Sequence, residues 1–133
     1  VLNSGTGFLN PVEETTLTIP STATTVITVG AYDARFDQAA AFSGRGYTRA
    51  TNQVKPDLVA PGVEIMSCAP GGGYQVRTGT SMATPFVTGS AALLMQWGIV
   101  NGNDAYLYGE KMKAYLIRGA RKLPGFTVYP NPV

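Results

Sequence analysis

The heptapeptide Gly79-Thr80-Ser81-Met82-Ala83-Thr84-Pro85 leads directly into a long apolar run, Phe86-Val87-Thr88-Gly89-Ser90-Ala91-Ala92-Leu93-Leu94-Met95-Gln96-Trp97. A glycine turn followed by small and apolar residues predicts a helix over about residues 81–97. Because this helix is apolar on nearly all sides, we expect it to be buried in a core. Ser81 stands where the turn becomes the helix, close to backbone N–H groups without a helical partner and to the positive end of the helix dipole. The position suits either a nucleophile or a plain N-cap serine.

The composition indicates one domain of modest charge. The chain has 133 residues, 44% of them hydrophobic, which is enough for the core of a single domain. Charged residues make up 14%, so we expect protein to cover much of the surface. The net charge of +2 is small and spread along the chain, which argues against a nucleic-acid partner. Gly89, Ser90 and Gln96 interrupt the apolar run, which favours a core helix over a membrane span.

The cysteine and histidine counts restrict the chemistry. The single cysteine, Cys68, excludes a disulfide within the chain and is expected to be a small buried residue. The chain has no histidine, so these residues alone cannot form a complete Ser-His-Asp hydrolase. With no histidine and one cysteine, we expect no side-chain metal site.

Segments before and after the central helix predict the rest of the fold. Four segments have the apolar patterns of strands: 25–31, 57–60, 63–69 and 74–78. After the central helix, Asp104 is expected to cap a second helix that extends to about Arg121. Residues 1–24 are polar and predict a loop, and no repeat or break in composition divides the chain.

Two other catalytic motifs do not fit the glycine turn. A phosphate-binding loop requires a lysine directly before a Ser or Thr and a glycine where Tyr74 stands, and both are missing. The G-x-S-x-G elbow of another hydrolase class fails because Ala83 replaces its second glycine.

Four ordered segments carry a resemblance to a known family. They are Val26-Ile27-Thr28-Val29-Gly30-Ala31, Phe42-Ser43-Gly44-Arg45-Gly46, Lys55-Pro56-Asp57-Leu58-Val59-Ala60-Pro61-Gly62-Val63 and the heptapeptide that begins at Gly79. The heptapeptide resembles the active-site serine signature of subtilisin-like serine proteases, and the resemblance covers about residues 17–120. It implies an α/β fold of three layers, with a mostly parallel sheet and a central buried helix. Residues 1–133 would be the C-terminal part of one peptidase domain, with 1–24 the end of an insertion or a loop.

The resemblance implies a role for each residue of the signature. Ser81 would be the nucleophile, and its backbone N–H would be one donor of the oxyanion hole. Thr80 would support that donor, and Gly79 would present backbone to the substrate. Asn3 is a weaker candidate for the oxyanion asparagine, because Leu2 stands where the family has a glycine. The alternative is an asparagine upstream of Val1, together with the catalytic aspartate and histidine.

The resemblance also bears on ligands and partners. No cofactor is required, although a family loop matching residues 20–26 sometimes binds a cation, so the carbonyls of Ala23 and Val26 are conceivable ligands of a structural calcium ion. The implied partners are a peptide or protein substrate and the missing N-terminal part of the same domain, with neither nucleic acid nor a membrane. Self-association is another way to cover the apolar surface that a partial domain exposes. An extracellular or cell-envelope location is favoured.

Three functional hypotheses follow. The first is a serine endopeptidase of subtilisin type whose Asp and His come from the N-terminal part, so that the isolated chain is inactive. The second is a degenerate protease that acts as a binding or regulatory module, against which the retained Ser81 argues. The third is a stand-alone structural domain, in which the central helix would lack strands on several sides and would leave apolar surface exposed.

Overall fold

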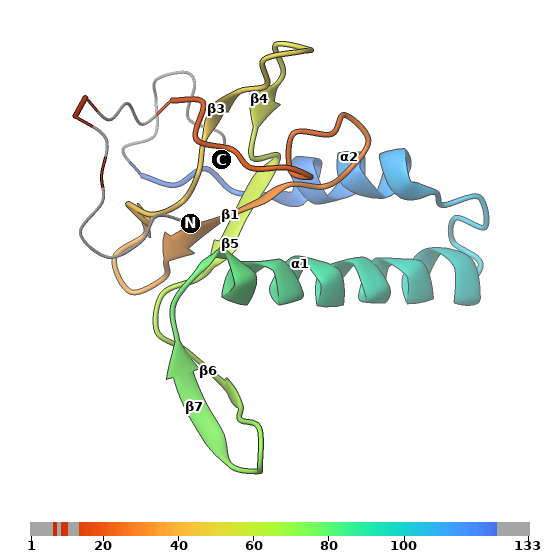
Figure 1. Ribbon diagram of the computed structural model, residues 1–133. Helices are drawn as coiled ribbons and strands as arrows, with labels where there is room; N and C mark the ends of the chain where they lie inside the picture. Colours follow the sequence, from red (N-terminus) through yellow and green to blue (C-terminus); the bar gives the residue numbers. More distant parts are fainter. Residues whose placement is uncertain (1–6, 8, 11–13, 125–133) are drawn as a thin grey trace.

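The computed structural model describes residues 7, 9–10 and 14–124 (Figure 1). Seven short strands precede the helices: β1 (Val29–Asp33), β2 (Gln38–Ala39), β3 (Gly46–Tyr47), β4 (Val54–Lys55), β5 (Leu58–Pro61), β6 (Ile65–Cys68) and β7 (Tyr74–Arg77). They are followed by α1 (Thr80–Met95), the π-helical segment η1 (Gln96–Val100) and α2 (Gly109–Gly119). In Figure 1, α1 and α2 run as two roughly parallel rods joined at one end, and the β6–β7 hairpin projects away from the body.

The central sheet has the order β2-β1-β5. β1 pairs in parallel with β5, with Val29 opposite Leu58 and Tyr32 opposite Pro61, and in antiparallel with β2. The other strands form two separate antiparallel pairs, β3–β4 and β6–β7. The parallel pair places the end of β5 beside the end of β1. Gly62, directly after β5, there accepts a hydrogen bond from Gly79, the glycine of the turn before α1.

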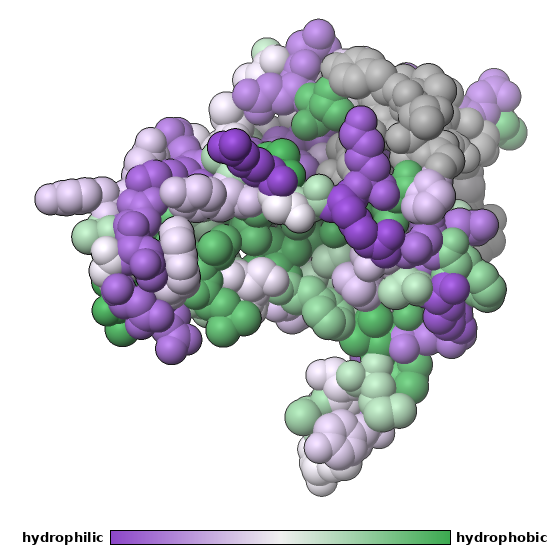
Figure 2. Space-filling model, turned by 180° about the vertical axis from the view of Figure 1, so that it is seen from behind, coloured by the Kyte–Doolittle hydropathy of each residue, from purple (hydrophilic) through white to green (hydrophobic). Residues whose placement is uncertain are grey.

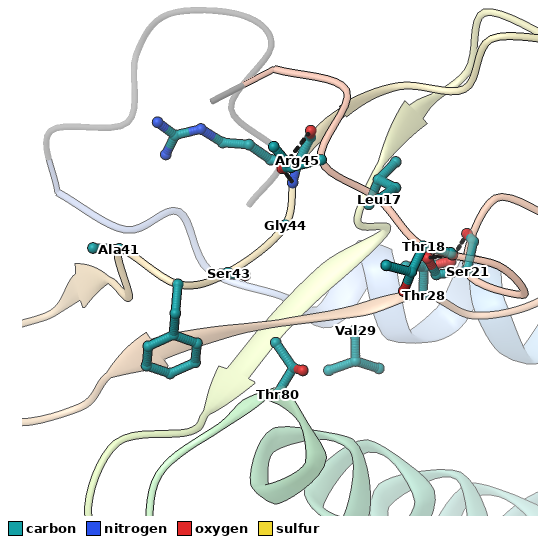
Figure 3. Close-up of a pocket in the computed structure, with 12 residues that line it drawn as sticks. Leu17, Thr18, Ser21, Thr28, Val29, Ala41, Ser43, Gly44, Arg45 and Thr80 are labelled. Atoms are coloured by element: carbon teal, nitrogen blue, oxygen red, sulfur yellow. Dashed lines mark hydrogen bonds between the residues drawn. The ribbon is translucent and has the colours of Figure 1, made fainter. Parts of the chain in front are cut away.

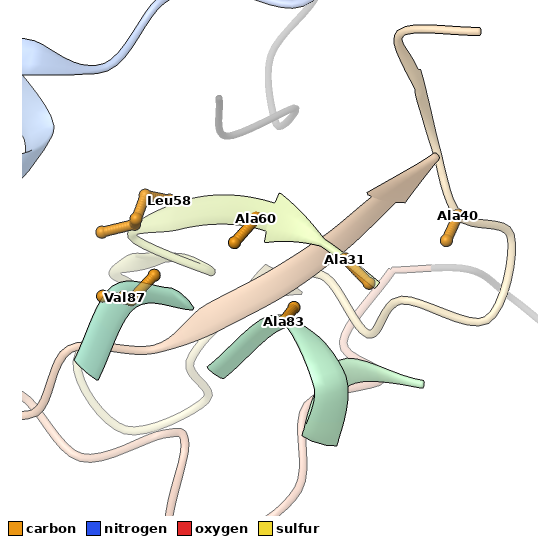
Figure 4. Packing of buried hydrophobic residues seen from close by; sticks show 6 residues of the cluster. All are labelled: Ala31, Ala40, Leu58, Ala60, Ala83 and Val87. Carbon is orange, nitrogen blue, oxygen red and sulfur yellow. The ribbon is translucent and has the colours of Figure 1, made fainter. Parts of the chain in front are cut away.

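Small residues form the core between the sheet and α1. The buried cluster contains Ala31, Ala40, Leu58, Ala60, Ala83 and Val87 (Figure 4). Ala31 of β1 and Ala83 of α1 are both fully buried. Because alanine side chains are short, the helix can lie close against the two strands, which fixes the start of α1 relative to β1 and β5.

The central helix is where it was predicted but is covered on one face only. α1 and η1 together span Thr80–Val100, and within α1 only Ala83 and Val87 are buried. Phe86 is 46% exposed and Leu93 is 68% exposed. Among the residues that the structure describes, the expected enclosure on all sides is not seen, because β1 and β5 cover a single face. The exposed apolar surface that a partial domain predicts is confirmed, and Figure 2 shows hydrophobic surface over the region of α1.

Within the described residues, Thr80–Val100 is also long and apolar enough to cross a membrane, judged by length and composition alone. One such helix is weak evidence, because the core helix of a soluble protein passes the same test.

β1 begins at Val29, four residues later than predicted. Two of the preceding backbone groups bond to charged side chains instead of to a neighbouring strand. The carbonyl of Val26 accepts hydrogen bonds from two lysines, and the N–H of Thr28 donates to the carboxylate of Asp57. A strand pattern therefore overlaps a segment that charged side chains hold in another conformation.

Two further predictions are wrong. α2 begins at Gly109 after Tyr108, without a side-chain cap, and the Asp104 carboxylate instead binds Lys111 and accepts a hydrogen bond from Tyr115. Cys68 is exposed because it lies at the end of β6, on the projecting hairpin, where the described residues offer no core to bury it.

Candidate active site

Gly79 makes the turn that places Ser81. Its backbone has φ +154° and ψ 163°, a conformation that residues with a Cβ rarely adopt. The Gly79 N–H donates to the Gly62 carbonyl at 2.8 Å, and the Met82 N–H donates to the Gly79 carbonyl at 3.0 Å. Gly79 is the N-cap and no side chain caps α1, so Ser81 is the second residue of the helix. The interpretation of Ser81 as an N-cap serine is therefore wrong.

The Ser81 side chain is exposed, and its hydroxyl has no hydrogen-bond partner within the described part of the chain. The first N–H groups of a helix lack an acceptor within it, and the helix dipole favours negative charge there. Thr80 is the first residue of α1 and Gly79 is its N-cap, and the roles expected of them toward an oxyanion and a substrate stay predictions. Asn3 lies outside the described residues. The start of α1 thus presents a free hydroxyl next to backbone donors suited to an oxyanion.

Gly62 supports this turn from the end of β5, a role that sequence reasoning missed. A Cβ at Gly62 would lie 2.5 Å from the Cβ of Ala31 and 3.0 Å from the Gly79 carbonyl oxygen. The Gly62 N–H also donates to the Tyr32 carbonyl at 3.0 Å. The Pro61-Gly62 pair signals a turn, but only the fold shows that the glycine is needed for the close approach of three backbone segments.

We expect Gly79→Ala to lower the free energy of unfolding by about 1–3 kcal/mol, the cost of a strained backbone conformation. Space is not the constraint, because the nearest atom to an added Cβ would be Met82 Sδ at 3.5 Å. Gly89→Ala is the matched control, since Gly89 lies within α1 with nothing within 4 Å of the new Cβ. That change should stabilise the helix by about 0.5–1 kcal/mol. Denaturant unfolding measures both, and a Gly79→Ala protein as stable as the wild type would contradict the account.

Two cavities adjoin Ser81 on different sides. One, of about 400 Å³, lies against the hairpin and is lined by Ile65, Met66, Ser67, Cys68, Gln75, Arg77, Ser81, Met82, Pro85 and Phe86. The other, of about 300 Å³, is lined by Pro20, Ser21, Val26, Ile27, Thr28, Val29, Thr80, Ser81 and Thr84. A peptide whose carbonyl lies at a nucleophile extends away from it in two directions, and this arrangement leaves room for both.

A larger cavity, of about 610 Å³, touches Thr80 but not Ser81. Figure 3 shows Thr80 and Val29 on one side of it and Gly44 and Arg45 on the other. Its lining is rich in hydroxyl groups and includes one ionisable side chain, that of Arg45. None of the described residues that line it is a carboxylate or histidine that could act as a general base for Ser81.

Three charged side chains are paired behind the smaller of the two cavities. The Asp57 carboxylate accepts hydrogen bonds from Lys55 and from the Thr28 N–H, each at 2.7 Å, and pairs with Lys113 at 2.7 Å. Its side chain is 8% exposed and that of Lys55 is 1% exposed. Burial acts to raise the pKa of Asp57, but the bonds from Lys113 and Lys55 outweigh it and hold this pKa below the usual range. Burial lowers the pKa of Lys55, and Asp57 offsets part of that effect.

The depressed pKa of Asp57 predicts a loss of stability in acid. A carboxyl whose pKa is lower in the folded than in the unfolded state stabilises the fold above the unfolded pKa, about 3.9, and loses this contribution as the pH falls through the folded pKa. We therefore expect the free energy of unfolding to fall as the pH is lowered below about 4. Asp57→Asn should flatten this dependence, whereas Glu110→Gln, on an exposed position of α2, should not. Denaturant titrations between pH 7 and pH 3 measure the difference, and equal curves for the two variants would contradict the assignment.

The two lysines also decide whether Val26 suits its conceivable role as a calcium ligand. The Val26 carbonyl accepts hydrogen bonds from the ammonium groups of both Lys55 and Lys113, each at 3.1 Å. A cation on this oxygen would lie against two positive charges, so Val26 does not fit as a calcium ligand. Ala23 lies exposed on the same loop. Among the described residues, no group of three or more His, Cys, Asp or Glu side chains could hold a metal ion.

Comparisons with known sequences show the family of the chain. The sequence pattern of the subtilase family matches residues 3–130. The chain is 39% identical over 89 residues to Proteinase R of Parengyodontium album, covering 67% of this chain and 21% of that protein. It is 48% identical over 71 residues to an intracellular serine protease of Paenibacillus polymyxa, covering 53% of this chain and 19% of that one. The chain thus spans about a fifth of the length of these relatives.

Solved structures of subtilisin-like proteases show the same fold as this chain. The CspB protease of Clostridium perfringens superposes with a TM-score of 0.90 and 48% identity, over 98% of this chain and 28% of that one. A cold-adapted subtilisin-like serine proteinase gives a TM-score of 0.61 and 34% identity, over 75% of this chain and 32% of that one. The fold is therefore part of the subtilisin-like α/β fold. The chain belongs to the subtilase family of serine proteases.

Proposed function

We propose that the protein is a serine endopeptidase of subtilisin type, which hydrolyses peptide bonds through an acyl-enzyme on Ser81. The observation that carries the proposal is the exposed, unbonded hydroxyl at the second residue of α1, beyond a glycine turn and between two cavities. Because the sequence has no histidine, the general base and the aspartate that orients it come from an N-terminal part of the same domain.

The proposed reaction divides between the two parts of the domain. The Ser81 oxygen attacks the carbonyl carbon of the substrate while the imidazole of the N-terminal part takes its proton. The negative charge on the carbonyl oxygen is stabilised by the Ser81 N–H and the positive end of α1, together with donors from the other part. The imidazole then protonates the leaving amine, and water hydrolyses the acyl-enzyme by the same route. Only side chains and backbone take part, so no cofactor is required.

We also propose that the N-terminal part covers the exposed apolar face of α1. Phe86 and Leu93 are seven residues apart, so they share one face of α1, and they are 46% and 68% exposed. Large apolar side chains left this exposed mark a surface that another part of a protein covers. The chain covers 28% of the CspB protease that it superposes on, so most of such a domain lies outside these residues. In this proposal, the N-terminal part of the domain both supplies the general base and packs against the exposed apolar side chains of α1. Self-association of the isolated chain is the competing way to bury this face.

Peptide hydrolysis tests whether Ser81 depends on a base from the N-terminal part of the domain. We expect the complete domain to hydrolyse a peptide substrate and the isolated 133-residue chain to show no activity above background. Activity of the isolated chain, abolished by Ser81→Ala, would contradict the need for an external base. A complete domain that folds but does not hydrolyse any peptide in a degenerate library would instead favour the binding or regulatory module.

A further inference from the structure

An ionic network of Asp57, Lys55 and Lys113, whose side chains are 8%, 1% and 19% exposed, joins α2 to the segment that walls the smaller cavity beside Ser81. Lys113 of α2 pairs with one Asp57 oxygen at 2.7 Å, and Lys55 binds the other at 2.7 Å. Both ammonium groups also donate to the Val26 carbonyl at 3.1 Å. Each lysine therefore bridges a carboxylate before β5 and a carbonyl before β1.

The network also fixes the residues that follow Val26. The Thr28 N–H donates to Asp57 at 2.7 Å, the Asp57 N–H donates to the Thr28 carbonyl at 2.8 Å, and the Thr28 hydroxyl donates to the Ser21 carbonyl at 2.6 Å. The loop from Ser21 to Thr28 is thus held at both ends. Thr28 is buried, so these bonds are shielded from water and are stronger for it.

This loop is one wall of the cavity that adjoins the nucleophile. Of the residues that line the cavity of about 300 Å³, Pro20, Ser21, Val26, Ile27, Thr28 and Val29 come from the loop or its flanks, and Thr80, Ser81 and Thr84 come from α1. The α1 side is set by the Gly79 turn and the alanine core. The opposite side has its position set by Asp57 and the two lysines.

We propose that Lys113 is a positioning residue for substrate binding: through Asp57 and Val26, it holds the Ser21–Thr28 wall at the distance from Ser81 that the substrate requires. Lys113 does not touch the reacting atoms, because its ammonium group is bound to Asp57 and Val26, behind the wall. The inference rests on the proposed peptidase activity. Its consequence is that the C-terminal helix contributes to the affinity for substrate through one side chain.

The test uses the complete domain and compares two lysines of the same helix. Lys113→Met removes the ammonium group and keeps most of the side-chain stem, whereas Lys111→Met removes an ammonium group that pairs with Asp104, outside the network. We expect Lys113→Met to raise KM for a peptide substrate by about 10- to 100-fold, because displacements of about 1 Å at a positioning contact have effects on this scale. Lys111→Met should leave KM within about twofold, and Lys113→Arg should restore most of the affinity since it keeps the charge.

A second measurement separates this proposal from the proposed function. A small fluorophosphonate needs Ser81 and its base but does not fill the cavity, so its rate of reaction should change less than threefold in Lys113→Met. Reaction at the wild-type rate together with an unchanged KM would overturn the positioning role and leave the peptidase standing. If wild-type protein fails to react, the proposed function itself is wrong. If Lys113→Met does not fold, Lys113→Gln, which keeps a donor, should raise KM to a smaller extent, and an unchanged KM in that variant would also overturn the proposal.

Discussion

Ser81→Ala is expected to abolish peptide hydrolysis by the complete domain, with kcat falling on the order of 10⁶-fold, the scale known for loss of the nucleophile in subtilisin. KM should change little, because the hydroxyl bonds to the substrate only during the chemical steps. The fold should be unaffected, since Ser81 is exposed and its hydroxyl has no partner in the described part of the chain. Steady-state kinetics and thermal unfolding measure the two effects separately.

Ser90→Ala is the matched control for this change. Ser90 is an exposed serine on the same helix, and its hydroxyl donates to the Phe86 carbonyl at 2.9 Å. We expect its kcat to match that of the wild type. A Ser81→Ala protein that keeps more than about a hundredth of the wild-type kcat would mean that another residue is the nucleophile, because serine-dependent catalysis leaves far less.

Asp57→Asn is expected to lower the free energy of unfolding by about 3–5 kcal/mol, the cost of leaving a buried charge without its partner. Lys55 is 1% exposed, and with Asp57 neutralised its ammonium group and that of Lys113 keep only carbonyl and amide oxygens as acceptors. Burial already lowers the pKa of Lys55, so losing its counter-charge should favour the neutral amine further. Denaturant unfolding at pH 7 measures the change.

A second aspartate provides the control. Asp37→Asn removes the same kind of charge from an ion pair with Arg121 at the surface, where the two side chains are 36% and 65% exposed. Exposed pairs contribute little, so this change should cost no more than about 1 kcal/mol. Adding Lys55→Met to Asp57→Asn should recover part of the loss, because it removes one uncompensated charge. Equal effects of Asp57→Asn and Asp37→Asn would show that the network does not hold the fold together.

The sequence alone was sufficient for features that depend on neighbouring residues. The glycine turn, Ser81 and the helix after it are encoded within about twenty consecutive residues, so both their identity and their order could be predicted. The strand predicted at residues 57–60 corresponds to β5 for a similar reason, because a short, mainly apolar run lies there between two prolines. The exposed apolar surface of α1 could also be predicted, because the sequence contains an apolar helix but too few strands to cover it.

Features that depend on distant partners could not be predicted. A lysine is usually exposed, and nothing near Lys55 in the sequence shows that its ammonium group is buried against the carbonyl of Val26, 29 residues earlier. The start of β1 was misplaced because its apolar pattern extends over residues whose backbone is bound by those side chains. Asp104 has the form of a helix cap, but Lys111 and Tyr115 compete for its carboxylate. The role of Gly62 appears only when β1 and the Gly79 turn are brought together.

The location of a covalent adduct tests the central claim most directly. The complete domain is treated with a fluorophosphonate, digested with trypsin and analysed by tandem mass spectrometry. Cleavage after Arg77 and Lys111 releases residues 78–111 as one peptide, and fragmentation separates Ser81 from Thr80 and Ser90. The account predicts a single adduct on Ser81 in the complete domain and none in the isolated chain, which has no histidine to activate the hydroxyl. An adduct on another residue, or equal modification of the isolated chain, would contradict it.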